Sequence, residues 1–235
     1  MKLGVKLPVG CAACPVRCLT IAADLAPEVL AEFNRHIVQR RLAPGQQVLV
    51  EGEPCTELFI VHAGRLKLYY QNEEGKEQII DLAGPGDLVG EAAIWEGGRC
   101  DVSAAAVEEA VVCALPGAYF RWLVQARPEV AWRVLALLGA KLAHSRLVAR
   151  DLALKRARER LAGVLLRLAA KEGEPVRDGV HLKMPLKVET LAYLAGLTPE
   201  TAARIMSRWR KEGIIRREKR RLVFDPKKLA PSAEN

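Results

Sequence analysis

Short apolar runs separated by glycine turns fill the chain between Leu42 and Pro116. Pairs such as Pro85-Gly86 interrupt the pattern before any run is long enough for a helix. Many short strands at near-regular spacing are typical of a small antiparallel barrel or jelly roll. The sequence therefore predicts an all-β unit whose strands include Gln47–Val50, Leu58–Val61, Leu66–Tyr70, Gln78–Leu82, Leu88–Val89 and Ala110–Leu115.

Helical patterns flank this region on both sides. Before it, helical spacing joins Leu25, Val29, Leu30 and Phe33, with Pro27 near the start of the pattern. After it, a long helical region is predicted from about residue 119 to 170. The polar segment 171–177 (KEGEPVR) then predicts a break before the final module.

The long helical region carries a stripe of apolar and small residues at alternating steps of three and four. Such a stripe is the seam of a coiled-coil-like pair, and a long helix cannot bury all of it on one small domain. We therefore expect a homodimer, the alternative being a stripe that packs only on its own barrel. The predicted interface residues are Leu135, Leu138, Leu142, Ser145, Ala149 and Leu152.

Basic residues are concentrated at the end of the chain. The whole chain has a net charge of +8, and most of that excess lies after Lys183. A basic module joined to a nearly neutral one indicates a polyanionic partner. A solvated basic tail is the simpler alternative that charge alone leaves open.

The segment 187–215 has the organisation of a helix-turn-helix. A first helix ends at Gly196, which suits a tight turn, and Thr198 with Pro199 then provides an N-cap and a first helical residue. Glu200 and Arg204 lie four residues apart and so share one helical face. They form either a surface ion pair or a base-reading pair; the cap, the turn and the basic flank favour base reading.

Two apolar stretches, Ile214-Ile215 and Leu222–Phe224, bracket the basic turn 216–221 (RREKRR). This pattern predicts a hairpin wing whose charges contact DNA phosphates. The predicted DNA-binding residues of the helix and wing are Thr198, Glu200, Thr201, Ala203, Arg204, Arg208, Arg216, Arg217, Lys219 and Arg220.

Other classes of protein are disfavoured. No apolar run approaches membrane-spanning length and no signal peptide is evident, so we expect a cytoplasmic protein without a membrane partner. Neither a nucleophile–base set nor a phosphate loop appears, and the four histidines are scattered, so we do not expect an enzyme.

The order of barrel, long helix and winged helix-turn-helix resembles the CRP/FNR superfamily of bacterial regulators. Gly84–Glu91 (GPGDLVGE) looks like the glycine-rich barrel turn of that family, and Gly196–Thr201 (GLTPET) followed by Arg204 looks like the start of its recognition helix. The resemblance implies an α+β fold with a cyclic-nucleotide-binding-like β-roll, a dimerisation helix and a winged helix-turn-helix. The expected divisions are a cysteine-rich leader at 1–20, a sensor domain at 21–118, a dimerisation helix at 119–155 and a DNA-binding domain at 156–235.

Four of the six cysteines extend this resemblance to the oxygen-sensing FNR branch. That branch holds a [4Fe-4S] cluster with three leader cysteines and one from a barrel strand, which here implies the ligands Cys11, Cys14, Cys18 and Cys113. The stretch before the third leader cysteine is shorter here than in that branch. Zinc binding, a thiol redox switch and inert cysteines remain open alternatives, and we expect Cys55 and Cys100 to be non-ligands.

Cyclic AMP is the ligand of the sister branch. Glu91 is present here, but Asp101-Val102 stands where that branch has an Arg-Ser pair for the cyclic phosphate, and Arg99 lies two positions out of register. A carboxylate should repel the phosphate, so nucleotide binding is the weaker interpretation. The resemblance also implies RNA polymerase as a partner and an operator that is a TTGA-type inverted repeat. A nucleotide- or haem-gated regulator without a cluster is the alternative.

Overall fold

The structure is a computed structural model that describes residues 10–23, 25–75, 77–95, 97–182, 187–218 and 221–229. The chain divides into two compact units, Met1–Leu142 and Ala143–Asn235. The boundary falls inside one long helix. Both units combine helices with antiparallel sheets, which confirms the expected α+β class.

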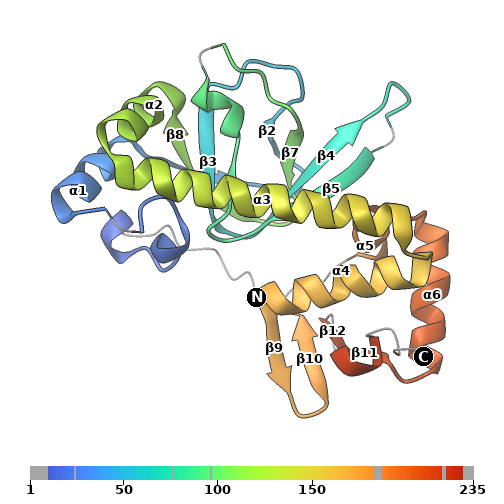
Figure 1. Cartoon of the computed structure of the whole chain (residues 1–235). Coiled ribbons are helices and arrows are strands. Elements are labelled where there is room, and N and C mark those ends of the chain that lie inside the picture. Colours follow the sequence, from blue (N-terminus) through green and yellow to red (C-terminus); the bar gives the residue numbers. More distant parts are fainter. Residues whose placement is uncertain are drawn as a thin grey trace. The chain divides into compact units, whose positions relative to one another are not determined.

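Two four-stranded antiparallel sheets form the β-roll of the N-terminal unit (Figure 1). Their strand orders are β1-β8-β3-β6 and β2-β7-β4-β5. The strands are β1 (Val38–Leu42), β2 (Gln47–Leu49), β3 (Glu57–Ala63), β4 (Leu66–Gln71), β5 (Glu77–Ala83), β6 (Leu88–Val89), β7 (Ser103–Ala106) and β8 (Ala110–Pro116).

Two strands of the roll lack the apolar runs by which the other strands were predicted. β1 has the sequence VQRRL and exposes most of its side chains, whereas β7 consists only of small buried residues. Neither alternates clearly between apolar and polar positions, so both depend on cross-strand partners. β1 pairs with β8, including Gln39 opposite Cys113, and β7 pairs with both β2 and β4.

The leader of the N-terminal unit forms two short 3-10 helices, η1 (Cys11–Ala13) and η2 (Arg17–Leu19). Helix α1 (Pro27–His36) follows and buries Val29, Leu30 and Phe33 in the core of the roll. Another 3-10 helix, η3 (Glu91–Ile94), begins at Gly90, whose φ of 83° favours glycine.

The long helical region is three helices rather than one. α2 (Gly117–Ala126) ends before Arg127, whose backbone is extended because the next residue is a proline. α3 (Pro128–Leu154), the long yellow-green helix of Figure 1, buries Val130 and Val134 against the roll. α4 (Ala157–Glu172) starts after a short break.

The C-terminal unit packs α4 and three later helices on a sheet of order β11-β12-β10-β9. Its core includes Leu161, Leu165, Met206, Trp209 and Phe224. The polar segment predicted as a break contains a strand, β9. The elements after α4 are β9 (Gly173–Val176), β10 (Gly179–Leu182), α5 (Val188–Leu194), α6 (Pro199–Lys211), β11 (Ile215–Glu218), β12 (Arg221–Phe224) and α7 (Pro226–Leu229).

Candidate DNA interface and cysteine site

A tight turn joins α5 to α6. Gly196 adopts a φ of 61°, and its amide donates to the carbonyl of Tyr193 at 3.0 Å. Thr198 is the N-cap of α6, because its hydroxyl accepts a hydrogen bond from the Thr201 amide at 3.3 Å. The turn glycine and the capped restart therefore hold the two helices in a helix-turn-helix.

The two faces of α6 differ in burial. Ala202, Met206 and Trp209 are buried in the core of the unit, whereas Ala203 and Arg204 are exposed. Among the described residues, no ion pair joins Glu200 to Arg204, so the simple surface-pair alternative has no support. The outward face leaves the Arg204 guanidinium available to a partner.

Glu200 is ionised at neutral pH. Its own backbone amide and the Thr198 hydroxyl donate hydrogen bonds that lower the pKa of this carboxyl group. The carboxylate lies in the first turn of α6, where the helix dipole also favours a negative charge. It can accept a hydrogen bond from the amino group of cytosine.

The predicted phosphate contacts have different environments. Arg208 is exposed but forms an ion pair with Glu212 at 2.8 Å, and Arg216 forms one with Glu218 at 2.8 Å. Arg217 is exposed on β11. β11 and β12 form the expected hairpin, in which Ile215 lies opposite Phe224 and Glu218 lies opposite Arg221. The remaining two, Lys219 and Arg220, lie outside the described residues.

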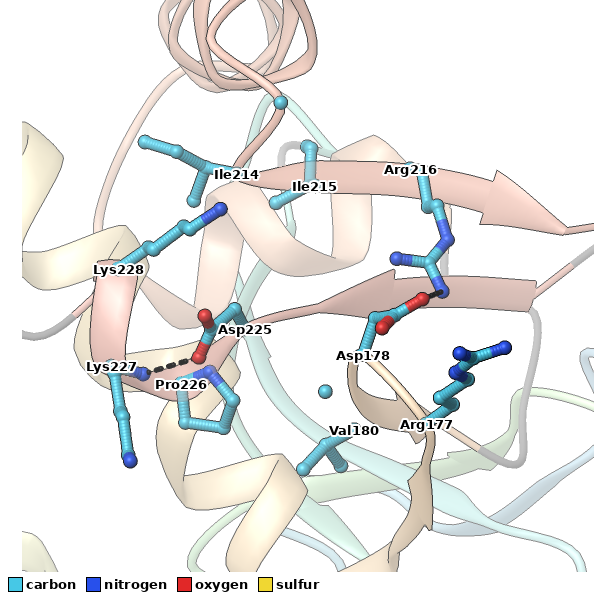
Figure 2. A pocket seen from close by; sticks show the side chains of 12 residues that line it. Arg177, Asp178, Val180, Ile214, Ile215, Arg216, Asp225, Pro226, Lys227 and Lys228 are labelled. Atoms are coloured by element: carbon cyan, nitrogen blue, oxygen red, sulfur yellow. Dashed lines mark hydrogen bonds and ion pairs between the residues drawn. The ribbon is translucent and has the colours of Figure 1, made fainter.

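An open pocket of about 570 Å³ lies beside this hairpin. Figure 2 shows the Arg216 side chain reaching toward Asp178, a pair separated by 4.0 Å. Asp225 accepts a hydrogen bond from the Lys227 amide at 3.0 Å. The carboxylates of Asp178 and Asp225 partly offset the basic side chains that line the pocket.

The leader cysteines approach one barrel strand. Burial raises the pKa of the Cys113 thiol to about 12, with further contributions from the neighbouring Cys11 and Cys14. Burial also raises the pKa of Cys11, and Cys14 adds to that effect. Cys14 Sγ lies 3.4 Å from His62 Nδ1, on the adjacent strand β3. Cys113 therefore lies near two leader thiols that are remote from it in sequence.

Cys18 is in the same leader but is exposed. Its carbonyl oxygen accepts a hydrogen bond from the Arg133 guanidinium at 2.8 Å, and Thr20 accepts another at 3.4 Å. Within the described ranges, no group of three or more His, Cys, Asp or Glu side chains is arranged to hold a metal ion. The contacts of Arg133 and His62 with the leader could not be predicted from the sequence, because they join segments that are distant along the chain.

The predicted dimer stripe of α3 is largely exposed in the single chain. Leu135 is 59% exposed and Leu142 is 53% exposed. Leu138 differs, because it packs partly against the core of the roll. Leu152, at the C-terminal end of the stripe, lies against the turn at Gly196, where an added Cβ would be 2.6 Å from its Cδ2 atom.

Glu91 of the glycine-rich turn is engaged within the protein. Its carboxylate forms an ion pair with Lys141 of α3, whose ammonium group also donates to the Leu88 carbonyl. Arg99, the arginine that lies two positions out of register, donates a hydrogen bond to the Gly52 carbonyl at 2.6 Å. The carboxylate that the sister branch offers to a nucleotide is thus neutralised from within the chain.

The β-roll, the long helix and the winged helix-turn-helix together define a DNA-binding transcription regulator. Residues 39–127 match the model of the cyclic nucleotide-binding domain, and residues 159–231 match the Crp-like helix-turn-helix domain. The chain is 32% identical over 193 residues to the cyclic AMP receptor protein of Thermus thermophilus, covering 82% of this chain and 86% of that protein. The protein therefore belongs to the CRP/FNR family of transcription regulators and is not an enzyme.

Relatives lie in both branches of the family. The anaerobic regulatory protein of Pasteurella multocida is 27% identical over 220 residues, which cover 91% of this chain and 80% of that protein. The fold resembles that of FixK2 from Bradyrhizobium japonicum, with a TM-score of 0.73, 22% identity and coverage of 82% and 95% of the two chains. In the part of the chain that the structure describes, every helix is too short or too polar to cross a membrane.

Proposed function

We propose that this protein is an oxygen-sensing regulator that binds DNA as a homodimer and holds a [4Fe-4S] cluster on Cys11, Cys14, Cys18 and Cys113. The observation that carries the proposal is the nearness of Cys113 to the leader thiols Cys11 and Cys14. Relatives named as anaerobic regulatory proteins agree with this assignment.

The donor set suits an iron–sulfur cluster. Four thiolates complete a cubane, and Cys113 lies near two of the three leader thiols, Cys11 and Cys14. Cys18 follows Cys14 in the same short segment and would supply the fourth. Because burial keeps Cys113 protonated at neutral pH, its ligation would release a proton. The bound cluster would supply sensitivity to oxygen.

The leader can influence α3 directly. Arg133 connects the carbonyl groups of Cys18 and Thr20 to this helix. A change in the leader thus reaches the helix that carries the dimer stripe. In thermodynamic terms, the liganded leader biases one state of a two-state dimer.

The DNA contacts follow from the outward face of α6. We assign Arg204 to the guanine and Glu200 to the cytosine of one G·C pair in a TTGA-type inverted repeat. Ala203 offers only a methyl contact to a neighbouring thymine. Wing charges would contact phosphates, and RNA polymerase would be the partner at promoters.

The test is to purify the protein without oxygen, record its visible spectrum and quantify iron, zinc and sulfide. We expect a brown protein with about four iron and four sulfide per chain, and DNA binding that falls on exposure to air. Zinc without sulfide would replace the cluster with a zinc site. Metal-free protein that still binds its operator tightly after anaerobic reconstitution would contradict the cluster and leave the regulator intact.

A nucleotide-gated regulator is the rival function. The 32% identical relative named as a cyclic AMP receptor protein favours it. Two features oppose it. Lys141 is already paired with Glu91, and Asp101 places a carboxylate where the sister branch has an arginine for the cyclic phosphate. Titration with cyclic AMP distinguishes the two: a rise in operator affinity at micromolar nucleotide would favour the rival.

A further inference from the structure

Two cysteines outside the proposed cluster site lie side by side in the β-roll. Cys55 precedes β3 and Cys100 precedes β7, and each is only 5% exposed. Pro54 and Arg99 form an antiparallel bridge between these two segments. The Cys55 amide donates to the Gly98 carbonyl at 2.8 Å, and the Cys100 amide donates to the Glu53 carbonyl at 2.9 Å.

This register directs both thiols to the same side of the bridge. Side chains alternate along an extended segment, so the residues that follow Pro54 and Arg99 share the face opposite to that pair. Gly98 stands across from Cys55 and has no side chain to separate the thiols. A Cβ at Gly98 would lie 1.9 Å from the Ala92 carbonyl oxygen, which explains the glycine.

The two thiols are neighbours in the structure. Burial raises the pKa of the Cys55 thiol to about 12, and the nearby Cys100 side chain adds to that effect. Cys55 Sγ donates to the Gly90 carbonyl at 3.5 Å. A disulfide bond requires the two sulfur atoms to approach to about 2.05 Å.

We propose that Cys55 and Cys100 form a redox-modification site that a hydroperoxide converts to an intramolecular disulfide. The Cys100 sulfur, as its thiolate, attacks the peroxide, so that the O–O bond breaks and a sulfenic acid and an alcohol, or water, form. The other sulfur attacks the sulfenic sulfur, the S–S bond forms and water leaves. The two thiols lose two electrons and two protons, which the peroxide takes up.

The disulfide would change the glycine-rich turn. It removes the S–H group that donates to the Gly90 carbonyl at the start of η3. The next residue, Glu91, holds Lys141 of α3. Oxidation of this pair therefore acts on a contact between the roll and α3 that does not involve the leader cysteines.

The test uses the full chain with Cys11→Ser, Cys14→Ser and Cys18→Ser, which removes the leader thiols and any cluster. The protein is treated with hydrogen peroxide, denatured in N-ethylmaleimide, digested and analysed by mass spectrometry. We expect a Cys55–Cys100 linked peptide that dithiothreitol removes, and a higher melting temperature of the oxidised protein.

Two controls make the result decisive. Adding Cys100→Ser should abolish the linked peptide, whereas adding Cys113→Ser should retain it. Full N-ethylmaleimide labelling of Cys55 and Cys100 after peroxide, or a link between Cys113 and either residue in place of the pair, would overturn the proposal. Because no cluster can form in this variant, that failure is separate from a failure of the proposed oxygen sensor.

Discussion

Arg133, near the start of α3, donates a hydrogen bond from its guanidinium to the carbonyl oxygen of Cys18 at 2.8 Å. A second bond to Thr20 makes the contact two-pronged. The cysteine leader and α3 are therefore joined by one side chain.

Arg133→Ala should uncouple sensing from DNA binding. We expect unchanged iron and sulfide content, and a ratio of anaerobic to aerobic operator affinity that falls by about tenfold, since a hydrogen bond to a charged donor contributes roughly 1.5 kcal/mol. Fluorescence anisotropy with operator DNA measures the ratio. Arg146→Ala, which removes another exposed arginine from α3, should leave it unchanged. An unaltered ratio in Arg133→Ala would remove this residue from the signalling path.

Arg204→Ala should weaken specific binding by about 1–3 kcal/mol, roughly 5- to 150-fold, because a bidentate contact to guanine is lost. Binding to non-operator DNA should change little. Competition binding against operators with a substituted G·C pair measures the discrimination. Arg210→Ala on the same helix is the matched control. Retained discrimination in Arg204→Ala would end the base-reading role of this residue.

Arg217→Ala should reduce affinity for all DNA sequences alike. It removes one exposed charge of the wing, so the slope of log affinity against log salt should become shallower by about 1. Equilibrium binding over a series of salt concentrations provides the slope. A loss confined to the operator sequence would instead indicate that Arg217 reads bases.

Leu142→Glu should convert a dimer to a monomer. Leu142 is 53% exposed on the predicted stripe, and two opposed carboxylates would replace an apolar contact. Light scattering coupled to size exclusion measures the mass, with at least a tenfold weaker self-association expected from about 1.5 kcal/mol or more of lost burial. Leu147→Glu is the control, since Leu147 is 43% exposed on the same helix but off the stripe. A dimer that survives Leu142→Glu would place the interface elsewhere.

Asp151→Asn should destabilise the C-terminal unit by about 2 kcal/mol, because the Asp151 carboxylate accepts charge-assisted bonds from Arg150 and Arg167 and pairs with Lys155. Burial raises the pKa of Asp151, but these cations lower it more, so the net shift is downward. A lowered pKa means that the contribution is present above about pH 4, the unfolded value, and is lost as pH falls through the folded value. Denaturation of both forms at pH 7 and pH 3 should show the difference shrinking in acid; an equal difference at both values would refute the ionic role.

Local chemistry alone was sufficient for much of the candidate DNA interface. Gly196, Thr198 and Pro199 each have a backbone requirement that a short segment reveals, so the turn, the cap and the restart of α6 could be predicted. The apolar strands of the roll could also be predicted, because each is a short apolar run that turn residues separate from the next. β1 and β9 could not be predicted, because their side chains are mostly exposed and only the partner strands hold them in the sheet.

The sequence by itself determined the class of protein, the helix-turn-helix and the set of cysteines proposed to bind a cluster. Only the tertiary structure decided which of those cysteines are neighbours, that Lys141 neutralises Glu91, that Arg133 joins the leader to α3, and that Cys55 lies near Cys100. Helix caps and turns depend on residues a few positions apart. Side-chain contacts between remote segments depend on the register of strands, which no local pattern encodes.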